Sequence, residues 1–460
     1  MIRFLRNVLT CATVALMVPA AFAGVLDPTF ADEGVKVLDF AGEPGMSGSE
    51  RGIANCPAAG DRQLVVTSDG ADLIVVARLS FDGSLDTSFG DGGVRHHAVA
   101  TTHYDTAAVA AVCRADGGIW IVASYGPSSD DQRIRLIAID SDGALVPGGA
   151  FGPSGYADVE FNVPGLMPKR RAMSFNQSPD GRAFAAGYVQ TAEDAQSVWV
   201  LVLDAQGNMR GITVFEPQGL GARPKPSAVG VGPGGGIWVV GHGWQANGVA
   251  FRSYLDPKSL ALVRTETFAI PGERIDVVGG LMVRSGVMVV GATRRLSGTH
   301  PARPFLLVMR TDSEITMLDL PLPDPLEDGG QTGISADGQA ISSLPGGSVL
   351  YGVGAEAWSG SAFNGYKGWY FSRAVIGASA AEDHVDADFG DGGSAVLSLR
   401  SGESDCDGLL NTQKHSRAGV WQGRPTVIGW WKRHCAPEGG DEGILMRLRP
   451  GDGIFANGFD

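Results

Sequence analysis

The sequence lacks the common signatures of a catalytic centre. It has no Gly-x-Ser-x-Gly nucleophile elbow, and the glycine-rich run 232–236 lacks the Lys-Ser/Thr pair and the helix of a phosphate-binding loop. Histidine is scarce, and the single cluster of His96, His97 and His103 has no nearby cysteine or carboxylate at a zinc-ligand spacing. We therefore assign no residue to catalysis from the sequence.

Long apolar runs are also missing. The run at residues 8–18 is eleven residues long, whereas a membrane-spanning helix needs about 20. Arg3 and Arg6 precede this run and Ala-Phe-Ala follows it at 21–23, which is the pattern of a cleaved secretory signal peptide. We predict a signal peptide over residues 1–23, no membrane span, and a mature protein located in the periplasm or outside the cell.

Positive charge is in deficit. The chain has 36 Lys and Arg against 50 Asp and Glu, a net charge of −14, which becomes −16 once the two arginines of the signal peptide are removed. Nucleic acids and anionic membranes demand clustered positive charge, so neither is expected as a partner. The balance is typical of a solvated, exported surface.

Cysteine is rare, and four of the five remain after cleavage of the signal peptide: Cys56, Cys113, Cys406 and Cys435. An even number in an exported protein favours disulfides over metal ligation or a catalytic thiol. Four cysteines allow three pairings. We prefer 56–113, which would join comparable strands of consecutive repeats, with 406–435, which would close a loop in the last repeat.

Glycine and proline are abundant, at 67 and 25 residues, which predicts many tight turns and few long helices. One turn recurs as a tag, Leu-Asp-Thr-Ser-Phe-Gly-Asp-Gly-Gly-Val at residues 85–94, with close copies at 26–35 and 385–394 and a worn copy at 145–156. The tags start 59, 60 and 240 residues apart, and 240 is four times sixty. A fixed period of this kind indicates a repeat architecture.

Each repeat carries two apolar runs that read as strands. Seven runs of the first kind are β-branched or aromatic and bounded by turn residues, as at 117–123 and 236–241. The second kind, as at 73–79, is followed in most repeats by a turn such as Asp82-Gly83. Units of about sixty residues and four strands are typical of propeller blades rather than solenoid coils. We predict an all-β fold, a seven-bladed β-propeller, with six or eight blades as alternatives.

The two ends of the chain complement each other. The C-terminus stops inside a broken copy of the tag, whereas the N-terminal copy has no strands before it. We expect residues 24–40 to pair with the last blade and close the ring, which removes an open sheet edge. One domain over residues 24–460 is predicted, with blades at roughly 50–99, 104–161, 168–220, 223–272, 274–325, 330–399 and 406–460.

The tag and its lead-in, Ala-Arg-Leu-Ser-Phe-Asp-Gly-Ser at residues 77–84, resemble the delta-60 repeat family, whose units end in Leu-Asp-x-x-Phe-Gly-x-x-Gly. The resemblance implies an exported bacterial protein of β-propeller type and uncharacterised function. It extends over the mature chain in period, but the tag is matched tightly only by the units ending at residues 35, 94 and 394, and the units between about 168 and 325 have lost it.

The tag offers one candidate metal site. Asp82, Asp86 and Asp91 lie within ten residues on a glycine-rich loop, and carboxylates are ligands that Ca²⁺ prefers. The alternative, which we favour, is that Asp86 caps a turn while the phenylalanine packs between sheets and the glycines permit positive φ. We therefore expect no cofactor, with calcium as the alternative.

Function has to lie in the variable loops between tags. Short basic runs at 168–171 and 294–295 could each meet an acidic ligand, although solvated surface is their default interpretation. Our hypothesis is a monomeric, non-enzymatic binding scaffold for a protein, glycan or surface ligand. The alternative is a glycan-active hydrolase or lyase with carboxylates gathered at the central mouth, an idea that rests on analogy of fold alone.

Overall fold

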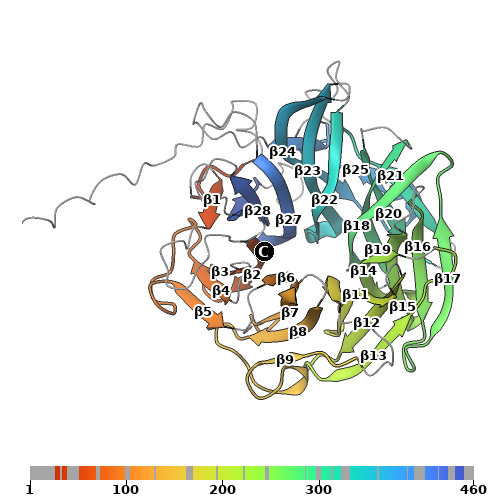
Figure 1. Cartoon of the computed structure of the whole chain (residues 1–460). Coiled ribbons are helices and arrows are strands. Elements are labelled where there is room, and N and C mark those ends of the chain that lie inside the picture. Colours follow the sequence, from red (N-terminus) through yellow and green to blue (C-terminus); the bar gives the residue numbers. More distant parts are fainter. Residues whose placement is uncertain are drawn as a thin grey trace, which may run out of the picture.

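The computed structural model describes residues 26–31, 34–38, 51–68, 73–98, 104–128, 131–161, 169–192, 195–220, 223–243, 248–284, 286–296, 302–311, 314–322, 332–359, 362–390, 392–397, 410–422, 424–433 and 441–449. Seven antiparallel sheets follow one another around a central axis (Figure 1). The predicted all-β propeller of seven blades is thereby confirmed, and the alternatives of six and eight blades are wrong.

The first three blades follow the chain directly. Blade 1 consists of β2 (Arg51–Ala58), β3 (Arg62–Ser68), β4 (Leu73–Leu79) and β5 (Val94–Ala98). Blade 2 consists of β6 (Tyr104–Cys113), β7 (Ile119–Ser128), β8 (Asp131–Ile139) and β9 (Tyr156–Asp158). Blade 3 consists of β10 (Arg170–Gln177), β11 (Ala183–Ala192), β12 (Ala195–Leu203) and β13 (Met209–Phe215).

The next three blades repeat this order. Blade 4 consists of β14 (Pro224–Val231), β15 (Ile237–Gly243), β16 (Ala250–Leu255) and β17 (Leu262–Phe268). Blade 5 consists of β18 (Glu273–Arg284), β19 (Val287–Leu296), β20 (Arg303–Met309) and β21 (Ile315–Asp319). Blade 6 consists of β22 (Thr332–Ser343), β23 (Ser348–Ser359), β24 (Ala362–Val375), β25 (His384–Val385) and β26 (Ser394–Leu397).

Blade 7 is assembled from both ends of the chain. It consists of β27 (Leu410–Trp421), β28 (Arg424–Arg433), β29 (Asp441–Arg447) and β1 (Val35–Leu38). β1 pairs antiparallel with β29, with Val35 opposite Met446. The predicted closure of the ring by the N-terminal segment is thus confirmed.

The strand order gives the ring two different faces. In each blade the first strand is innermost and the chain moves outwards strand by strand (Figure 1). The connections from second to third strand and from one blade to the next therefore emerge on one face, which we call the variable face. The turns from first to second strand and the tags emerge on the opposite face, which we call the tag face.

The small residue that ends most of the first apolar runs has a packing reason. Every innermost strand shifts register against its neighbour through a bulge or irregularity. Backbone crowds the neighbouring strand there: a Cβ on Gly187 would lie 1.9 Å from the Arg171 carbonyl oxygen, and one on Gly241 would lie 2.1 Å from that of Lys225. Glycine is needed at these two positions because a larger residue would collide with the bulge.

The tag binds an arginine of the third strand. Arg78 on β4 donates from Nε to Asp86 at 2.8 Å, and its guanidinium carbon lies 4.7 Å from the centre of the Phe89 ring. The same triplet recurs twice, as Arg373, Asp386 and Phe389 in blade 6 and as Arg447, Asp27 and Phe30 in blade 7. Charge pairing and cation–π contact together stabilise a guanidinium that would otherwise be costly to bury.

The tag phenylalanine also joins its blade to the next one. A Cβ on Gly143, in the turn after β8, would lie 2.3 Å from Phe89 of blade 1. Gly83 stands in the same relation to Phe30 of blade 7. The glycine of each Asp-Gly turn therefore adopts positive φ and, because it has no side chain, leaves room for the aromatic ring of the preceding blade to pack on the turn. This supports the interpretation of the tag as a structural joint.

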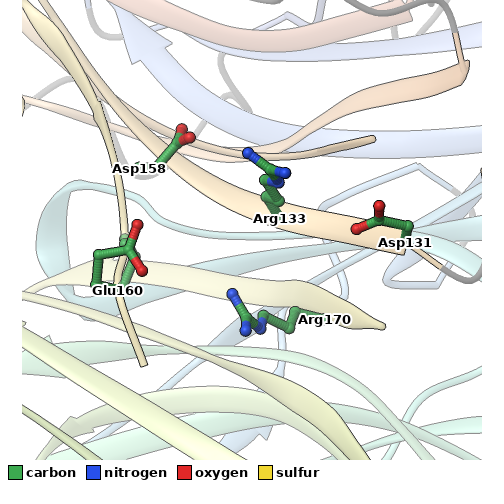
Figure 2. A pocket seen from close by; sticks show the side chains of 6 residues that line it. Asp131, Arg133, Asp158, Glu160 and Arg170 are labelled. Carbon is green, nitrogen blue, oxygen red and sulfur yellow. The ribbon is translucent and has the colours of Figure 1, made fainter. Parts of the chain in front are cut away.

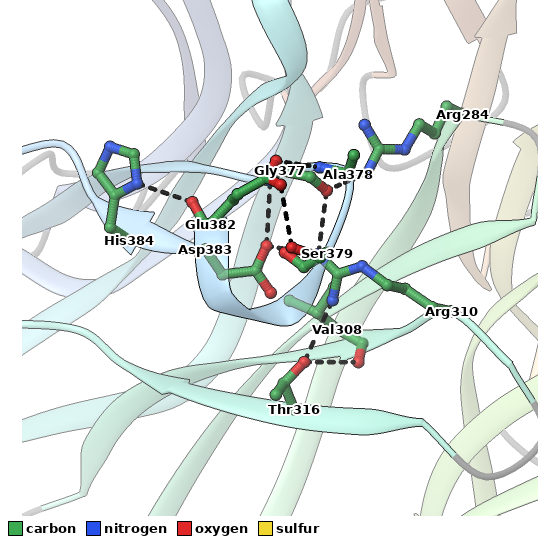
Figure 3. Close-up of polar contacts among 10 residues, drawn as sticks. All are labelled: Arg284, Val308, Arg310, Thr316, Gly377, Ala378, Ser379, Glu382, Asp383 and His384. Atoms are coloured by element: carbon green, nitrogen blue, oxygen red, sulfur yellow. Dashed lines mark hydrogen bonds and ion pairs between the residues drawn. The ribbon is translucent and has the colours of Figure 1, made fainter.

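Blades 4 and 5, which lack the tag, use other arginines for the same task. The connection after β16 is only six residues long, so blade 4 has no room for a tag. Its fully buried Arg252 donates to the Thr311 carbonyl oxygen of blade 5 at 3.1 Å. Arg310 of blade 5 in turn reaches Asp383 and the Gly377 carbonyl oxygen of blade 6 (Figure 3).

We expect Asp27→Asn to open the closure. Arg447 is fully buried, so the substitution leaves a buried guanidinium without its carboxylate, which typically costs about 3–5 kcal/mol. The unfolding midpoint in urea and the Tm should both fall. Asp82→Asn, which changes an exposed tag-face carboxylate, is the control and should leave both values nearly unchanged. Equal midpoints for the two variants would contradict this account of closure.

Gly143→Ala tests the packing of the Phe89 ring on the turn after β8. Its matched control is Gly60→Ala, because Gly60 has a similar φ of 70° against 76° but nothing within 4 Å of an added Cβ. Both variants carry the strain of positive φ, and only Gly143→Ala also overlaps Phe89. We expect it to be less stable than the control by about 1–3 kcal/mol in urea unfolding. Equal losses would show that the ring contact is unimportant.

Candidate functional site

A cavity of about 340 Å³ opens on the variable face at the crossover from blade 2 to blade 3. It lies where β8 begins, where β9 ends and where β10 begins. The lining side chains are Asp131, Arg133, Asp158, Val159, Glu160 and Arg170. Five of the six carry a charge, and Figure 2 shows these five gathered around one space. The volume is at the lower end of the range for small-molecule sites.

The strand pairing explains why these residues meet. Arg135 pairs with Asp158 across β8 and β9, which sets the acidic end of β9 beside the start of β8. An isolated parallel bridge joins Gln132 of β8 to Lys169, just before β10. Arg171 donates to the side-chain oxygen of Gln132 at 3.1 Å and so fixes the same crossover. The cavity is therefore framed by backbone pairing between the two blades.

Asp158 is the most firmly held of the lining residues. Arg135 donates to it from Nε at 2.7 Å, and the hydroxyl of Tyr125 donates to its other oxygen. The guanidinium of Arg135 also lies over the Tyr125 ring, with 4.2 Å between its carbon and the ring centre. This network leaves Asp158 as an oriented hydrogen-bond acceptor at the cavity wall.

The network fixes the protonation of both partners. Burial raises the pKa of Asp158, but the hydrogen bonds from Arg135 and Tyr125 outweigh it and hold the pKa below the usual range. Burial and the bond to Asp158 raise the pKa of Tyr125 to about 12. At neutral pH the carboxyl is thus ionised and the phenol is protonated, so the pair is suited to accepting hydrogen bonds rather than to abstracting or donating protons.

The candidate calcium residues lie on the opposite face of the ring. Asp86 is buried and bound by Arg78 and Arg62, and its hydrogen bond from Ser88 helps to hold its pKa below the usual range. Asp82 accepts hydrogen bonds from Ser84, and both Asp82 and Asp91 are exposed. Within the described part of the chain no group of three or more acidic, histidine or cysteine residues is arranged so that it could hold a metal ion. Calcium binding stays an alternative.

One predicted disulfide is present. Cys56 on β2 and Cys113 on β6 are bonded and so link the innermost strands of blades 1 and 2. This bond is consistent with an exported protein. Cys406 and Cys435, like the predicted signal peptide at 1–23, lie outside the described residues.

Two histidines serve joints between blades. His97 on β5 places Nε2 2.6 Å from the Gly143 carbonyl oxygen of blade 2. His242 on β15 is buried, and its Nδ1 accepts a hydrogen bond from the Val277 N–H of blade 5 at 3.2 Å. His103 lies outside the described residues.

Little in the sequence predicts the cavity. Asp131, Asp158 and Glu160 belong to no motif; Asp131 begins β8, whereas Asp158 ends β9 and Glu160 follows it, so only the fold brings Asp131 to the other two. The one sequence signal is the basic run at 168–171, which supplies Arg170 and is a place where an acidic ligand could bind.

No family model matches the chain, and no curated protein matches it in sequence. Among solved structures it is similar to an ulvan lyase of a polysaccharide lyase family, at 9% identity and a TM-score of 0.45 over 88% of this chain and 95% of that one. It is also similar to a protein of unknown function from Dyadobacter fermentans, at 12% identity and a TM-score of 0.40 over 90% of this chain and 100% of that one. An N11 neuraminidase-like protein of a bat influenza virus is similar at 11% identity and a TM-score of 0.38 over 91% of this chain and 94% of that one.

These similarities concern the fold alone. In the described residues there is no helix of the length and hydrophobicity that a bilayer crossing requires.

The joint at His242 predicts a pH dependence of stability. Burial lowers the pKa of His242 to about 4 from its ordinary 6.5, although Asp276 opposes this shift. Between these values the unfolded chain binds a proton that the folded chain does not, so this contribution is complete above pH 6.5 and lost as the pH falls towards 4. His242→Asn keeps an acceptor for Val277 but cannot titrate. Its Tm should fall less than that of the parent between pH 7 and about 4.5, and parallel curves would contradict the assignment.

Proposed function

We propose that this protein is an exported binding protein that presents the variable face of its propeller to a polar ligand, with the cavity between blades 2 and 3 as the contact point. The single observation that carries the proposal is the lining: three carboxylates and two guanidinium groups around one small cavity. Such a set can accept hydrogen bonds from hydroxyl groups and donate to anionic ones, which suits a glycan.

The state of the titratable groups supports binding over catalysis. A general acid needs a carboxyl whose pKa is raised towards neutrality, whereas that of Asp158 is lowered. A tyrosine base needs a lowered pKa, whereas that of Tyr125 is about 12. In this proposal the protein acts as a monomer in the periplasm or outside the cell. Its disulfide and its acidic composition fit the exported location.

A glycan-active hydrolase or lyase is the second candidate. The observation that favours it is the placement of Asp158 and Glu160 two residues apart on one cavity wall, because paired carboxylates carry out glycoside hydrolysis. To distinguish the two functions, a glycan that binds the protein is incubated with it and then analysed by mass spectrometry. Shortened or unsaturated products would favour the enzyme, whereas recovery of intact glycan favours the binding protein.

A glycan and peptide array tests the proposed function. The mature protein should bind at least one component, and Glu160→Gln should weaken that binding by about tenfold, since it removes a charged hydrogen-bond acceptor from an exposed position. Asp91→Asn is the control, because it makes a similar change on the tag face. An array without any bound component, or equal binding by the two variants, would overturn the proposal.

A further inference from the structure

A row of cations continues from the cavity along the variable face. The innermost strand of blade 3 is preceded by Lys169 and begins with Arg170 and Arg171, and that of blade 4 is preceded by Arg223 and carries Lys225 as its second residue. No acid stands among residues 169–171 or 223–225. These five cations, which we call the cationic rim, lie where the two strands begin at the central axis.

The rim does not continue into blade 5. At the corresponding start of that blade, Glu273 and Asp276 flank Arg274. Blade 5 therefore begins with two acids and one cation, whereas residues 169–171 and 223–225 contain no acid. In a chain with a net charge of −14, five cations on two adjacent strand starts are a local reversal of sign.

The rim and the cavity form one surface. Arg170 belongs to both, because it lines the cavity and opens β10. Blades 3 and 4 are held side by side at the axis, where Asn176 of β10 donates to the Val229 carbonyl oxygen of β14 at 3.2 Å. A ligand anchored in the cavity can therefore extend along the rim towards Lys225. A cavity of about 340 Å³ holds only a small part of such a ligand.

The chemistry of the two regions selects the ligand class. The cations pair with carboxylate or sulfate groups, and the guanidinium of Arg170, which lies over the Phe161 ring at 5.1 Å, offers a planar fork for them. The carboxylates of Asp158 and Glu160 can accept hydrogen bonds from hydroxyl groups and repel further acids. An acidic polysaccharide supplies both groups on successive units, whereas an acidic peptide supplies mainly carboxylates.

The acceptor and the cations recur together. Glu160 follows β9 and precedes the cations of blade 3, and Glu216 follows β13 and precedes those of blade 4. Both glutamates are exposed. A polymer whose units each carry hydroxyl and acid groups matches this repetition from one blade to the next.

We infer that the ligand is an acidic polysaccharide, bearing uronate or sulfate groups, which places one unit in the cavity and extends over the cationic rim of blades 3 and 4. This inference rests on the proposed function and narrows its ligand.

The test measures the binding of the mature full-length protein to fluorescent polygalacturonate by polarisation, with neutral dextran and single-stranded DNA as comparison polymers. Polygalacturonate should bind, dextran should not, and DNA should bind more weakly. The double variant Arg170→Gln/Lys225→Gln should raise the Kd for polygalacturonate by about tenfold or more. Arg210→Gln/Lys258→Gln, which removes the same two charges from exposed tag-face positions of blades 3 and 4, should leave the Kd unchanged.

The outcomes separate this inference from the proposed function. Equal Kd values for the two double variants, binding of DNA as tight as that of polygalacturonate, or binding of neutral or peptide components only, would each overturn the acidic polysaccharide. The array result with Glu160→Gln would still decide the proposed function. If the rim variant does not fold, the salt dependence of the parent protein serves instead: affinity for polygalacturonate has to fall as NaCl rises, and a flat response overturns the inference.

Discussion

Closure of the ring depends on burying an arginine guanidinium between blade 7 and blade 1. Removing this cation from water is expensive, and only a carboxylate together with further acceptors offsets the cost. Arg447 shows the complete set: it is fully buried, it pairs with Asp27 at 2.7 Å, it donates to the Phe81 carbonyl oxygen of blade 1, and it packs on Phe30. Because Asp27 and Arg447 lie near opposite ends of the chain, this joint also closes the ring.

This constraint divides the molecule into two faces with different freedom. The arginine joints described above lie on the tag face, where a change in a loop would leave a buried charge unpaired. The variable face carries the connections between blades, and the cavity and cationic rim lie there. Arg252, which pairs with Glu266 at 2.8 Å, and Arg310, which pairs with Asp383, show that an arginine joint can be built without a tag.

The fold could be predicted from the sequence because a repeated joint produces a repeated tag. The seven first apolar runs at a sixty-residue period predict seven blades, and the broken tag at the C-terminus predicts a closed ring. The equivalent strand positions favour the bond between Cys56 and Cys113. The role of Asp86 stayed ambiguous because acids and glycines suit both a calcium loop and a turn. Its partner Arg78 decides its surroundings, and that contact depends on how the loop folds back over β4.

The site could not be predicted from the sequence for the opposite reason, since it is unique rather than repeated.

The charges of the cavity and the cationic rim also decide how a polyanion could bind a protein of net charge −14. At physiological salt, charges more than about 8 Å apart are largely screened, so a ligand at the rim responds to the nearby cations more than to the distant acidic surface. The negative net charge of the protein still repels a polyanion at long range. A ligand that binds through charge alone therefore loses affinity. A ligand that also gives hydroxyl groups to Asp158 and Glu160 gains short-range hydrogen bonds that a nucleic acid phosphate lacks. The proposed selectivity for an acidic glycan rests on this combination of local attraction and general repulsion.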